Sequence, residues 1–350
     1  MPLNLYLLPP ADLPLAGELS GTLRRPLLMA DSEAQLRRLA REEEYAVVAI
    51  TSPTLSDRCR GELANSGFLL APGICSLPYA LELTAAWRSA LPRKTAAFRS
   101  LLKQCAKSSG EFGLFAPDDR ILVGVSGGED SLMLMHLLTA LQKRLPFRIE
   151  IFPALVDMGY PGFNAPALAD YCQAQGWTLQ IERLEEIQEF FAENAVQSKP
   201  CALCSRLRRG RLHRLLDTLH CNKLALGHHL DDLCTSFMIA LFRGGGLKTM
   251  APSTFADGGK ARLIRPLWNC RKRDIHAAAR FFGFPQIRSC PYEDQLKDGD
   301  RHFLNNLLLE LETRFPDLHS AMRHSMGDIR LAHLLDPRYR NIPDADSGKL

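Results

Sequence analysis

The sequence predicts an α/β protein with a doubly wound parallel sheet, preceded by a smaller α/β domain. Between residues 121 and 226, short apolar segments alternate with longer segments of helical periodicity. This alternation is typical of parallel strands that helices cover on both faces. Polar or glycine-rich turns follow three of the strands, at 126–131, 157–163 and 227–232. Because ligands bind at the carboxyl ends of the strands in such sheets, we expect these turns to form one site.

Composition limits the function only loosely. The chain has 350 residues, is 46% hydrophobic and 23% charged, and carries a net charge of +4. That charge is compatible with nucleic-acid binding but does not require it. No apolar run approaches the ~20 residues that span a membrane, and the N-terminus lacks the basic segment of a signal peptide. We therefore expect a cytoplasmic protein with no membrane partner, whose cysteines are mostly thiols.

The first domain, residues 1–87, is predicted to be a small α/β unit. Strand candidates lie at 3–8, 26–30, 45–51 and 68–71, and an amphipathic helix is expected at 32–44. No group of chemically reactive residues occurs here, so scaffold, docking surface and RNA-contact module all remain open as its role.

The second domain is expected to cover residues 88–337, with a polar tail at 338–350. Helices are predicted at 92–106, 131–143, 165–175 and 204–219, and strands at 121–125, 149–157, 178–184 and 223–226. A further strand is expected at 265–267. Trp268 could pack beneath that strand or stack on a base. Two amphipathic helices, broken at Pro316, complete the domain between 303 and 335.

The turn at 126–131 reads Ser-Gly-Gly-Glu-Asp-Ser and joins a buried strand to a helix. The first N–H groups of a helix lack internal partners and favour an anion, and glycines leave no side chain in the way of a phosphate. An acid beside such a site could hold a divalent cation such as Mg²⁺ against the phosphates. A plain strand-to-helix turn is the alternative for a glycine pair alone. The candidate phosphate ligands are Ser126, Gly127, Gly128, Asp130 and Ser131.

The turn at 227–232 reads Gly-His-His-Leu-Asp-Asp. Asp231 and Asp232 could serve only the dipole of the helix that follows. Two histidines and two aspartates at a strand end, in a fold that already carries a phosphate turn, favour a functional site. His228 and His229 could bind zinc, but no thiolate or third histidine stands at ligand spacing, which argues against it.

Cys201 and Cys204 form a Cys-x-x-Cys pair at the start of a helix. Alone, the pair fits a redox couple, half of a zinc site, cluster ligands or two incidental cysteines. Lysines and arginines but no acids occupy 199–214, and a second acid-free basic run spans 260–273. A solvated helix face seldom lacks acids over such a length, so an RNA or phosphate surface is predicted. The expected RNA contacts are Arg206, Arg208, Arg209, Arg211, Lys248 and Arg265.

Taken together, these motifs resemble those of the tRNA 2-thiocytidine synthetases, the TtcA-like branch of the PP-loop ATP pyrophosphatases. The matching segments are 126–131, 157–163, 200–210, 225–232, 244–252 and 264–267. The resemblance covers about residues 88–337. It implies an adenine nucleotide alpha hydrolase-like fold and ATP bound by Ser126, Gly127, Gly128, Asp130, Ser131, Asp157, Gly227 and His228.

The resemblance also implies the chemistry. Asp130, Asp231, Asp232, Cys201 and Cys204 would be catalytic, and Cys201, Cys204 and Cys290 would hold a [4Fe–4S] cluster with one iron open to sulfide. A cytidine carbonyl of tRNA would be adenylated and its oxygen replaced by sulfur. ATP and Mg²⁺ would be further cofactors, and tRNA and a sulfur donor such as a cysteine desulfurase would be partners, with a homodimer left open.

Three positions depart from the family pattern. Glu129 stands where lysine is usual, Thr235-Ser236 replace Glu-Thr, and Glu293 replaces a second cysteine after Cys290. Two alternatives therefore stay open. One is sulfur transfer to another nucleoside or to a small molecule, and the other is a non-catalytic RNA-binding paralogue of the same fold. Release of pyrophosphate and AMP that depends on tRNA would separate them from the leading hypothesis.

Overall fold

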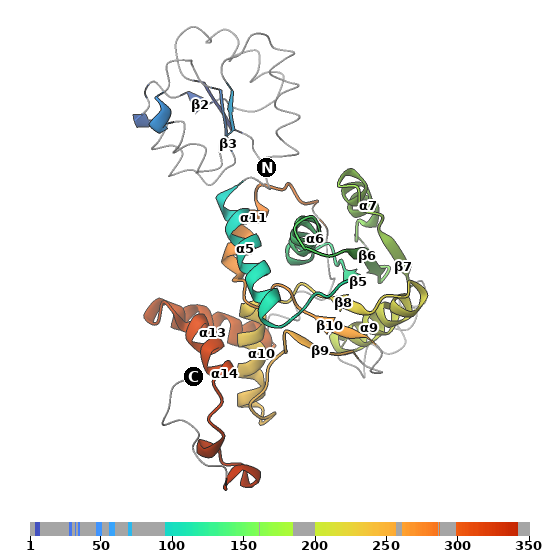
Figure 1. The fold of residues 1–350 in the computed structure, drawn as a ribbon, viewed down its shortest axis with the longest axis vertical. Helices are drawn as coiled ribbons and strands as arrows, with labels where there is room; N and C mark the ends of the chain where they lie inside the picture. Colours follow the sequence, from blue (N-terminus) through green and yellow to red (C-terminus); the bar gives the residue numbers. More distant parts are fainter. Residues whose placement is uncertain are drawn as a thin grey trace.

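The computed structural model describes residues 95–160, 162–184, 200–256, 261–285, 287 and 299–341, with short segments of the first 94 residues at 4–7, 28–29, 32, 34–35, 47–50, 56–59 and 69–71. The described strands form two separate sheets, one of four strands and one of six. Figure 1 shows the first sheet apart from the second, which carries most of the helices.

The N-terminal sheet is entirely parallel, in the order β2-β1-β3-β4. Its strands are β1 (Asn4–Leu7), β2 (Leu28–Met29), β3 (Val47–Ile50) and β4 (Leu69–Ala71). All four predicted strands are confirmed. Of the helix predicted at 32–44 only residues 34–35 are described as helical, and the domain boundary at 87 lies outside the described residues.

The second sheet has six strands in the order β7-β6-β5-β8-β10-β9. The strands are β5 (Asp119–Gly124), β6 (Ile149–Asp157), β7 (Gln180–Arg183), β8 (Lys223–Ala225), β9 (Ser253–Phe255) and β10 (Arg262–Ile264). Every neighbouring pair is parallel except β9 and β10, which pair antiparallel. The predicted doubly wound sheet is confirmed, with an antiparallel edge strand that the sequence did not predict.

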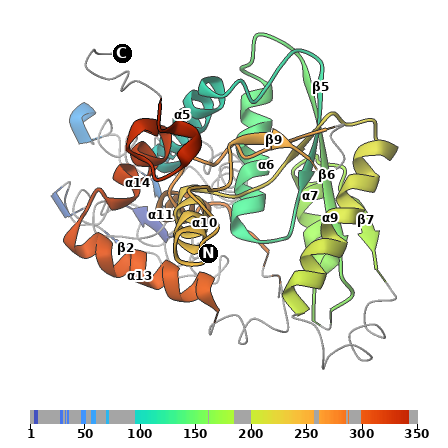
Figure 2. The ribbon, with the colours of Figure 1, turned by 90° about the horizontal axis from the view of Figure 1, so that it is seen from below.

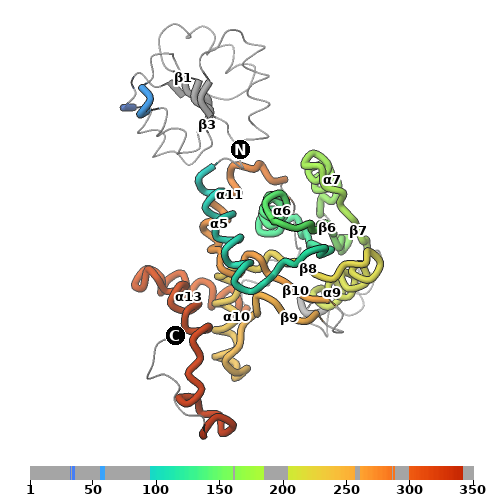
Figure 3. Tube along the Cα trace, in the orientation of Figure 1, coloured from blue at the N-terminus to red at the C-terminus, as the bar shows by residue number. Residues whose placement is uncertain are grey.

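Helices cover both faces of this sheet. The helices of this part of the chain are α5 (Ala96–Glu111), α6 (Glu129–Gln142), α7 (Ala165–Ala174), α9 (Pro200–Thr218), α10 (Leu230–Phe242), α11 (Lys272–Ala279), α13 (Asp300–Arg314) and α14 (Leu318–Gly327), of which α13 and α14 pack against α10. Figure 2 shows α6 and α9 on opposite sides of the strands. Figures 1 and 3 show α13 beside α10.

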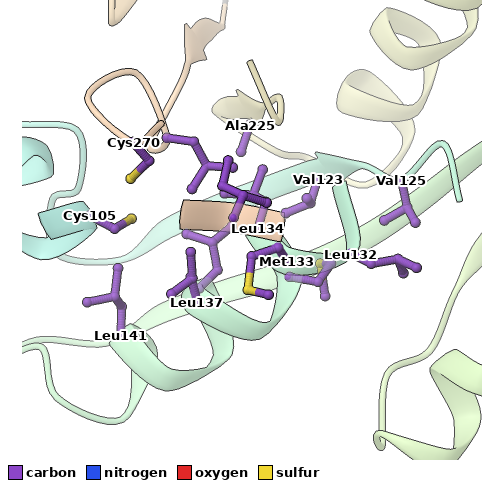
Figure 4. Packing of buried hydrophobic residues seen from close by; sticks show 14 of the residues in the cluster. Cys105, Val123, Val125, Leu132, Met133, Leu134, Leu137, Leu141, Ala225 and Cys270 are labelled. Atoms are coloured by element: carbon purple, nitrogen blue, oxygen red, sulfur yellow. The ribbon is translucent and has the colours of Figure 1, made fainter. Parts of the chain in front are cut away.

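The alternation of side chains along β5 explains the two layers. Ile121, Val123 and Val125 pack into the core under α6, whereas Leu122 packs into a second core with α9. Successive residues of a strand point to opposite faces of a sheet, so an unbroken apolar run serves both cores. Figure 4 shows the first core, where Val123 and Val125 lie near Leu132 and Met133 of α6.

One predicted element is wrong. The strand expected at 265–267 ends earlier, at Ile264, and the chain then turns, with the Trp268 N–H donating to the Arg265 carbonyl at 3.0 Å. The Trp268 indole is 5% exposed and donates from Nε1 to the Ser108 carbonyl. Trp268 therefore packs in the core and cannot stack on a base.

The C-terminal helices follow the prediction, with the break at Pro316 between α13 and α14. Short 3-10 turns follow at Leu331–His333 and Pro337–Tyr339, so the polar tail begins with local structure. Among the described residues, no helix combines the length and the apolar character needed to cross a membrane.

Candidate active site

The turn between β5 and α6 is tied together by its own two hydroxyl groups. The Ser126 N–H donates to Ser131 Oγ at 3.1 Å, and that hydroxyl donates to the Gly128 carbonyl at 2.8 Å. The Gly128 N–H lies 3.3 Å from Ser126 Oγ. Gly127 has φ +82°, a conformation that favours glycine. No described side chain caps α6, whose N-cap residue is Gly128, so its first N–H groups stay open to an anion within this part of the chain.

The turn after β8 meets the turn after β5 at backbone distance. A β-carbon at Gly227 would lie 3.1 Å from the carbonyl carbon of Asp130 and 3.2 Å from the Ser131 nitrogen. This proximity follows from the pairing of β5 with β8, because adjacent parallel strands end at the same edge. The predicted convergence of the 126–131 and 227–232 turns is confirmed.

Lys272, the first residue of α11, reaches the phosphate turn. Its Nζ lies 2.6 Å from Asp130 Oδ1 and 3.1 Å from Glu129 Oε2. His276 Nδ1 lies 3.0 Å from Glu129 Oε1. Burial lowers the pKa of Lys272, but Asp130 and Glu129 outweigh it and the pKa is raised. Glu129, which departs from the family pattern, is thus partnered by the Lys272 ammonium and the His276 ring.

His229 lies among three carboxylates. Its Nε2 is 3.4 Å from Asp232 Oδ2 and 3.9 Å from Asp130 Oδ2, and its Nδ1 is 3.6 Å from Asp231 Oδ2. Burial lowers the pKa of His229, but the carboxylates of Asp231, Asp232 and Asp130 around the ring raise it overall. Asp232 also accepts from the His229 N–H at 3.2 Å and lies 3.4 Å from Arg301. His229 can therefore carry a proton at the edge of the site.

The carboxylate of Asp231 is bound by Arg271 and by the backbone of Lys272. Its carboxylate is buried and accepts from Arg271 Nε at 3.2 Å and from the Lys272 N–H at 2.8 Å. Burial raises the pKa of Asp231, but His229, the Lys272 N–H and Arg271 lower it overall. Asp231 therefore fixes the start of α11, the helix that carries Lys272, and its catalytic role stays a prediction.

Asp157 is hydrogen-bonded within its own turn, whereas His228 keeps a ring nitrogen without a partner among the described residues. Asp157 is buried at the end of β6, accepts from the Gly159 N–H at 2.9 Å and lies 3.4 Å from Arg183 Nε. It shapes its own turn, and its contact with ATP stays a prediction. Burial lowers the pKa of His228 to about 4, and its Nδ1 has no hydrogen-bond partner among the described residues.

The Cys-x-x-Cys pair lies in the first turns of α9. Cys204 is half-buried, packs with Tyr160 against the core on that face, and has Arg208 Nη2 3.9 Å from its Sγ. The side chain of Cys201 and all of Cys290 lie outside the described residues.

Ile287, three residues before Cys290, lies directly on the phosphate turn. A β-carbon at Gly127 would lie 3.1 Å from Ile287 Cγ2. Ile287 is the described residue nearest to Cys290 in the sequence, and it lies at this turn. Cys105 and Cys221, by contrast, are buried in the cores. Burial raises the pKa of Cys105 to about 12 and that of Cys221 to about 11. Such thiols behave as inert apolar groups.

The expected RNA contacts separate into exposed and buried residues. Arg206, Arg209 and Lys248 are exposed, whereas Arg208 and Arg211 are half-buried, the latter 3.9 Å from Glu182. Arg265 is buried, and its guanidinium donates to the Ala251 carbonyl. Arg265 therefore belongs to the core and not to a surface for RNA, which corrects the prediction.

Metal ligands are not assembled in the part of the chain that is described. No group of three or more histidine, cysteine or acidic side chains there could hold a metal ion. The cation next to Asp130 is the Lys272 ammonium. Lys272 holds one oxygen of the Asp130 carboxylate, and binding of Mg²⁺ by Asp130 stays a prediction.

A doubly wound sheet with an open helix start after β5, closed in by the turn after β8, defines a PP-loop nucleotide-binding protein. The profile described as "PP-loop domain" matches residues 95–287. The chain is 35% identical over 246 residues to the tRNA-cytidine(32) 2-sulfurtransferase of Geotalea daltonii, covering 70% of this chain and 98% of that one. It is 36% identical over 248 residues to the enzyme of that name from Geobacter sulfurreducens, covering 71% and 96%. The chain belongs to the PP-loop family of tRNA-cytidine(32) 2-sulfurtransferases.

A solved structure has the same fold. The U34-tRNA thiolase NcsA from Methanococcus maripaludis, solved with its [4Fe-4S] cluster, has a TM-score of 0.55 with 21% sequence identity, covering 66% of this chain and 78% of that one. As a PP-loop protein, the present chain binds ATP.

Proposed function

We propose that this protein is an ATP-dependent tRNA sulfurtransferase that replaces the carbonyl oxygen of a cytidine base with sulfur. The observation that carries the proposal is the contact of both Gly227 and Ile287 with the phosphate turn. That contact brings the turn at 126–131, the turn at 227–232 and Ile287, three residues before Cys290, to one edge of the sheet. The choice of tRNA cytidine as substrate rests on the relatives named tRNA-cytidine(32) 2-sulfurtransferase, which align with this chain over nearly their whole length.

The reaction needs two displacements. First, the carbonyl oxygen of the base attacks the α-phosphorus of ATP, and the bond from that phosphorus to the pyrophosphate oxygen breaks. The open N–H groups at the start of α6 and the two serine hydroxyls would hold the phosphates. Second, sulfur attacks the activated carbon, and the oxygen leaves as part of AMP. His229, whose pKa is raised, would hold a proton beside the reacting groups.

Three cysteines are the predicted ligands of the group that would deliver the sulfur. Cys201, Cys204 and Cys290 would hold a [4Fe–4S] cluster, which when bound supplies an iron with an open position for sulfide. The position of Cys204 in α9 and of Ile287 on the phosphate turn support this ligand set. Mg²⁺ would enter as the chelate of ATP. A cysteine desulfurase as sulfur donor and a homodimer remain predictions.

The test is thiolation by the anaerobically purified protein with ATP, sulfide and tRNA, followed by nucleoside analysis. We expect a thiolated cytidine, with one AMP and one pyrophosphate released for each thiolation and none without tRNA. AMP release that needs only a small molecule would favour the small-molecule alternative. Binding of tRNA with no AMP release under any condition would favour a non-catalytic paralogue.

A further inference from the structure

Lys272 is fixed at both ends. Its backbone N–H donates to the buried Asp231 carboxylate at 2.8 Å, and its ammonium lies 2.6 Å from Asp130 and 3.1 Å from Glu129. Asp130 and Glu129 are in the first turn of α6, the helix start that faces the phosphate site. The ammonium is therefore held next to the open N–H groups of this turn by residues of two other elements.

The ammonium has donor capacity left for a ligand. A lysine ammonium carries three N–H donors, and two of them are directed to Asp130 and Glu129. No described residue accepts the third. The side chain is 41% exposed, so a ligand at the turn can reach it.

The charges of the turn require such a cation. Glu129 and Asp130 place two carboxylates at a helix start that would otherwise attract an anion. A polyphosphate that enters this turn is repelled by both, unless a cation lies between them and the phosphate oxygens. The described basic side chains in contact with this acid pair are Lys272 on both acids, His276 on Glu129 and His229 on Asp130.

We propose that Lys272 is the phosphate-binding lysine of this site, and that Glu129 and Asp130 hold its ammonium against the phosphates of ATP. The turn itself contributes acids, and the cation comes from α11. Lys272 stays protonated throughout and offsets the charge that develops on the pyrophosphate as it leaves. This role rests on the proposed function, since it takes ATP as the ligand.

The test is ATP binding by the full chain carrying Lys272→Met, measured by equilibrium dialysis without tRNA. Loss of one hydrogen bond to a charged group predicts roughly 10- to 100-fold weaker ATP binding. Adenosine, which has no phosphate, should bind the variant and the wild type equally. Lys103→Met, at an exposed position of α5, is the matched control and should leave ATP binding unchanged.

Exchanging the two charges tests the pairing directly. Lys272→Glu alone should abolish ATP binding, whereas Lys272→Glu combined with Glu129→Lys restores the ion pair with the cation on the turn and should recover most of the affinity. Wild-type ATP affinity in Lys272→Met, or a gain as the freed acids recruit Mg²⁺, would overturn the proposal. A wild-type protein that binds no ATP at all would overturn the proposed function as well.

Discussion

Gly227 is the residue through which the turn at 227–232 contacts the phosphate turn at 126–131. A β-carbon there would lie 3.1–3.2 Å from backbone atoms of Asp130 and Ser131, and backbone cannot move aside as a flexible side chain can. Gly227→Ala should therefore destabilise the protein by about 1–3 kcal/mol and weaken ATP binding. Urea unfolding and equilibrium dialysis measure the two effects.

Gly110→Ala is the matched control for that substitution. Gly110 lies in α5, and nothing lies within 4 Å of the added carbon. Because alanine favours helix over glycine, this variant should gain about 0.5–1 kcal/mol. Equal stability of the two variants would show that the turns do not pack as closely as described.

His228 makes the stability depend on pH. Burial lowers its pKa from 6.5 to about 4. Between these values the unfolded chain binds a proton that the folded chain does not, so the stability contributed by the neutral ring is complete above pH 6.5 and declines as the pH falls toward 4. The pKa difference corresponds to about 3 kcal/mol at most.

The comparison of wild type with His228→Gln isolates this effect. Glutamine has no titratable group, so the variant should lose less stability than the wild type when urea unfolding is repeated at pH 5 after pH 7.5. Parallel losses in the two proteins would mean that His228 is solvated and titrates normally.

At this scale the sequence revealed the local roles and missed the distant ones. The glycines and serines of the phosphate turn act on neighbours a few positions away, so their spacing was sufficient. Lys272 meets Asp130 from 142 positions away, and nothing in the basic run around it distinguishes one lysine from the next. Asp231 and Asp232 look alike in sequence, and only the burial of Asp231 against Arg271 distinguishes it from the half-buried Asp232.

Among the elements, α11 is held in place by a buried ionic network. Arg271, just before its first residue, donates to Glu312 of α13 at 2.7 and 2.8 Å and to Asp231 of α10 at 3.2 Å. His319 of α14 lies 3.6 Å from Asp231. A bidentate guanidinium–carboxylate pair fixes orientation as well as distance, so the C-terminal helices set the position of Lys272.

The strands and helices were predictable where the chain is strongly apolar or periodic. The central strands form one continuous core and leave a clear signal. The hairpin of β9 and β10 was missed because β9 is a short edge strand of polar and exposed residues. The strand expected at 265–267 is wrong because the chain turns after Ile264. The burial of Arg265, whose guanidinium donates to the Ala251 carbonyl, is not revealed by composition.

Helix α9 presents the basic surface expected to contact tRNA. Arg206 and Arg209 are exposed on it, so replacing both with alanine should weaken tRNA binding and flatten its salt dependence, since each lost phosphate contact removes roughly one counterion from the slope. Lys143→Ala with Arg144→Ala removes the same charge from exposed positions at the end of α6 and is the control. If both double variants shift the slope equally, only net charge matters and α9 is not the contact surface.

Over the whole molecule, the prediction that joins the most distant parts is the cysteine set of the cluster. Cys201 and Cys204 share the first turns of α9, and Ile287, three residues before Cys290, lies on the phosphate turn. Folding of the two halves of the sheet around β5 and β8 should therefore bring the three thiols to one edge. Cys221 and Cys270, by contrast, are buried, and burial raises the pKa of both thiols.

Serine substitution separates these two groups of cysteines. Cys201→Ser, Cys204→Ser and Cys290→Ser should each lose most of the iron and sulfide of the anaerobically purified protein, because a [4Fe–4S] cluster with three protein ligands tolerates the loss of none easily. They should also lose thiolation while keeping ATP binding, since the nucleotide turn lies on separate residues. Cys221→Ser is the matched control and should retain iron, sulfide and activity. Full iron content in Cys290→Ser would show that the third ligand lies elsewhere, and the folding argument that brings Cys290 to this edge would then fail.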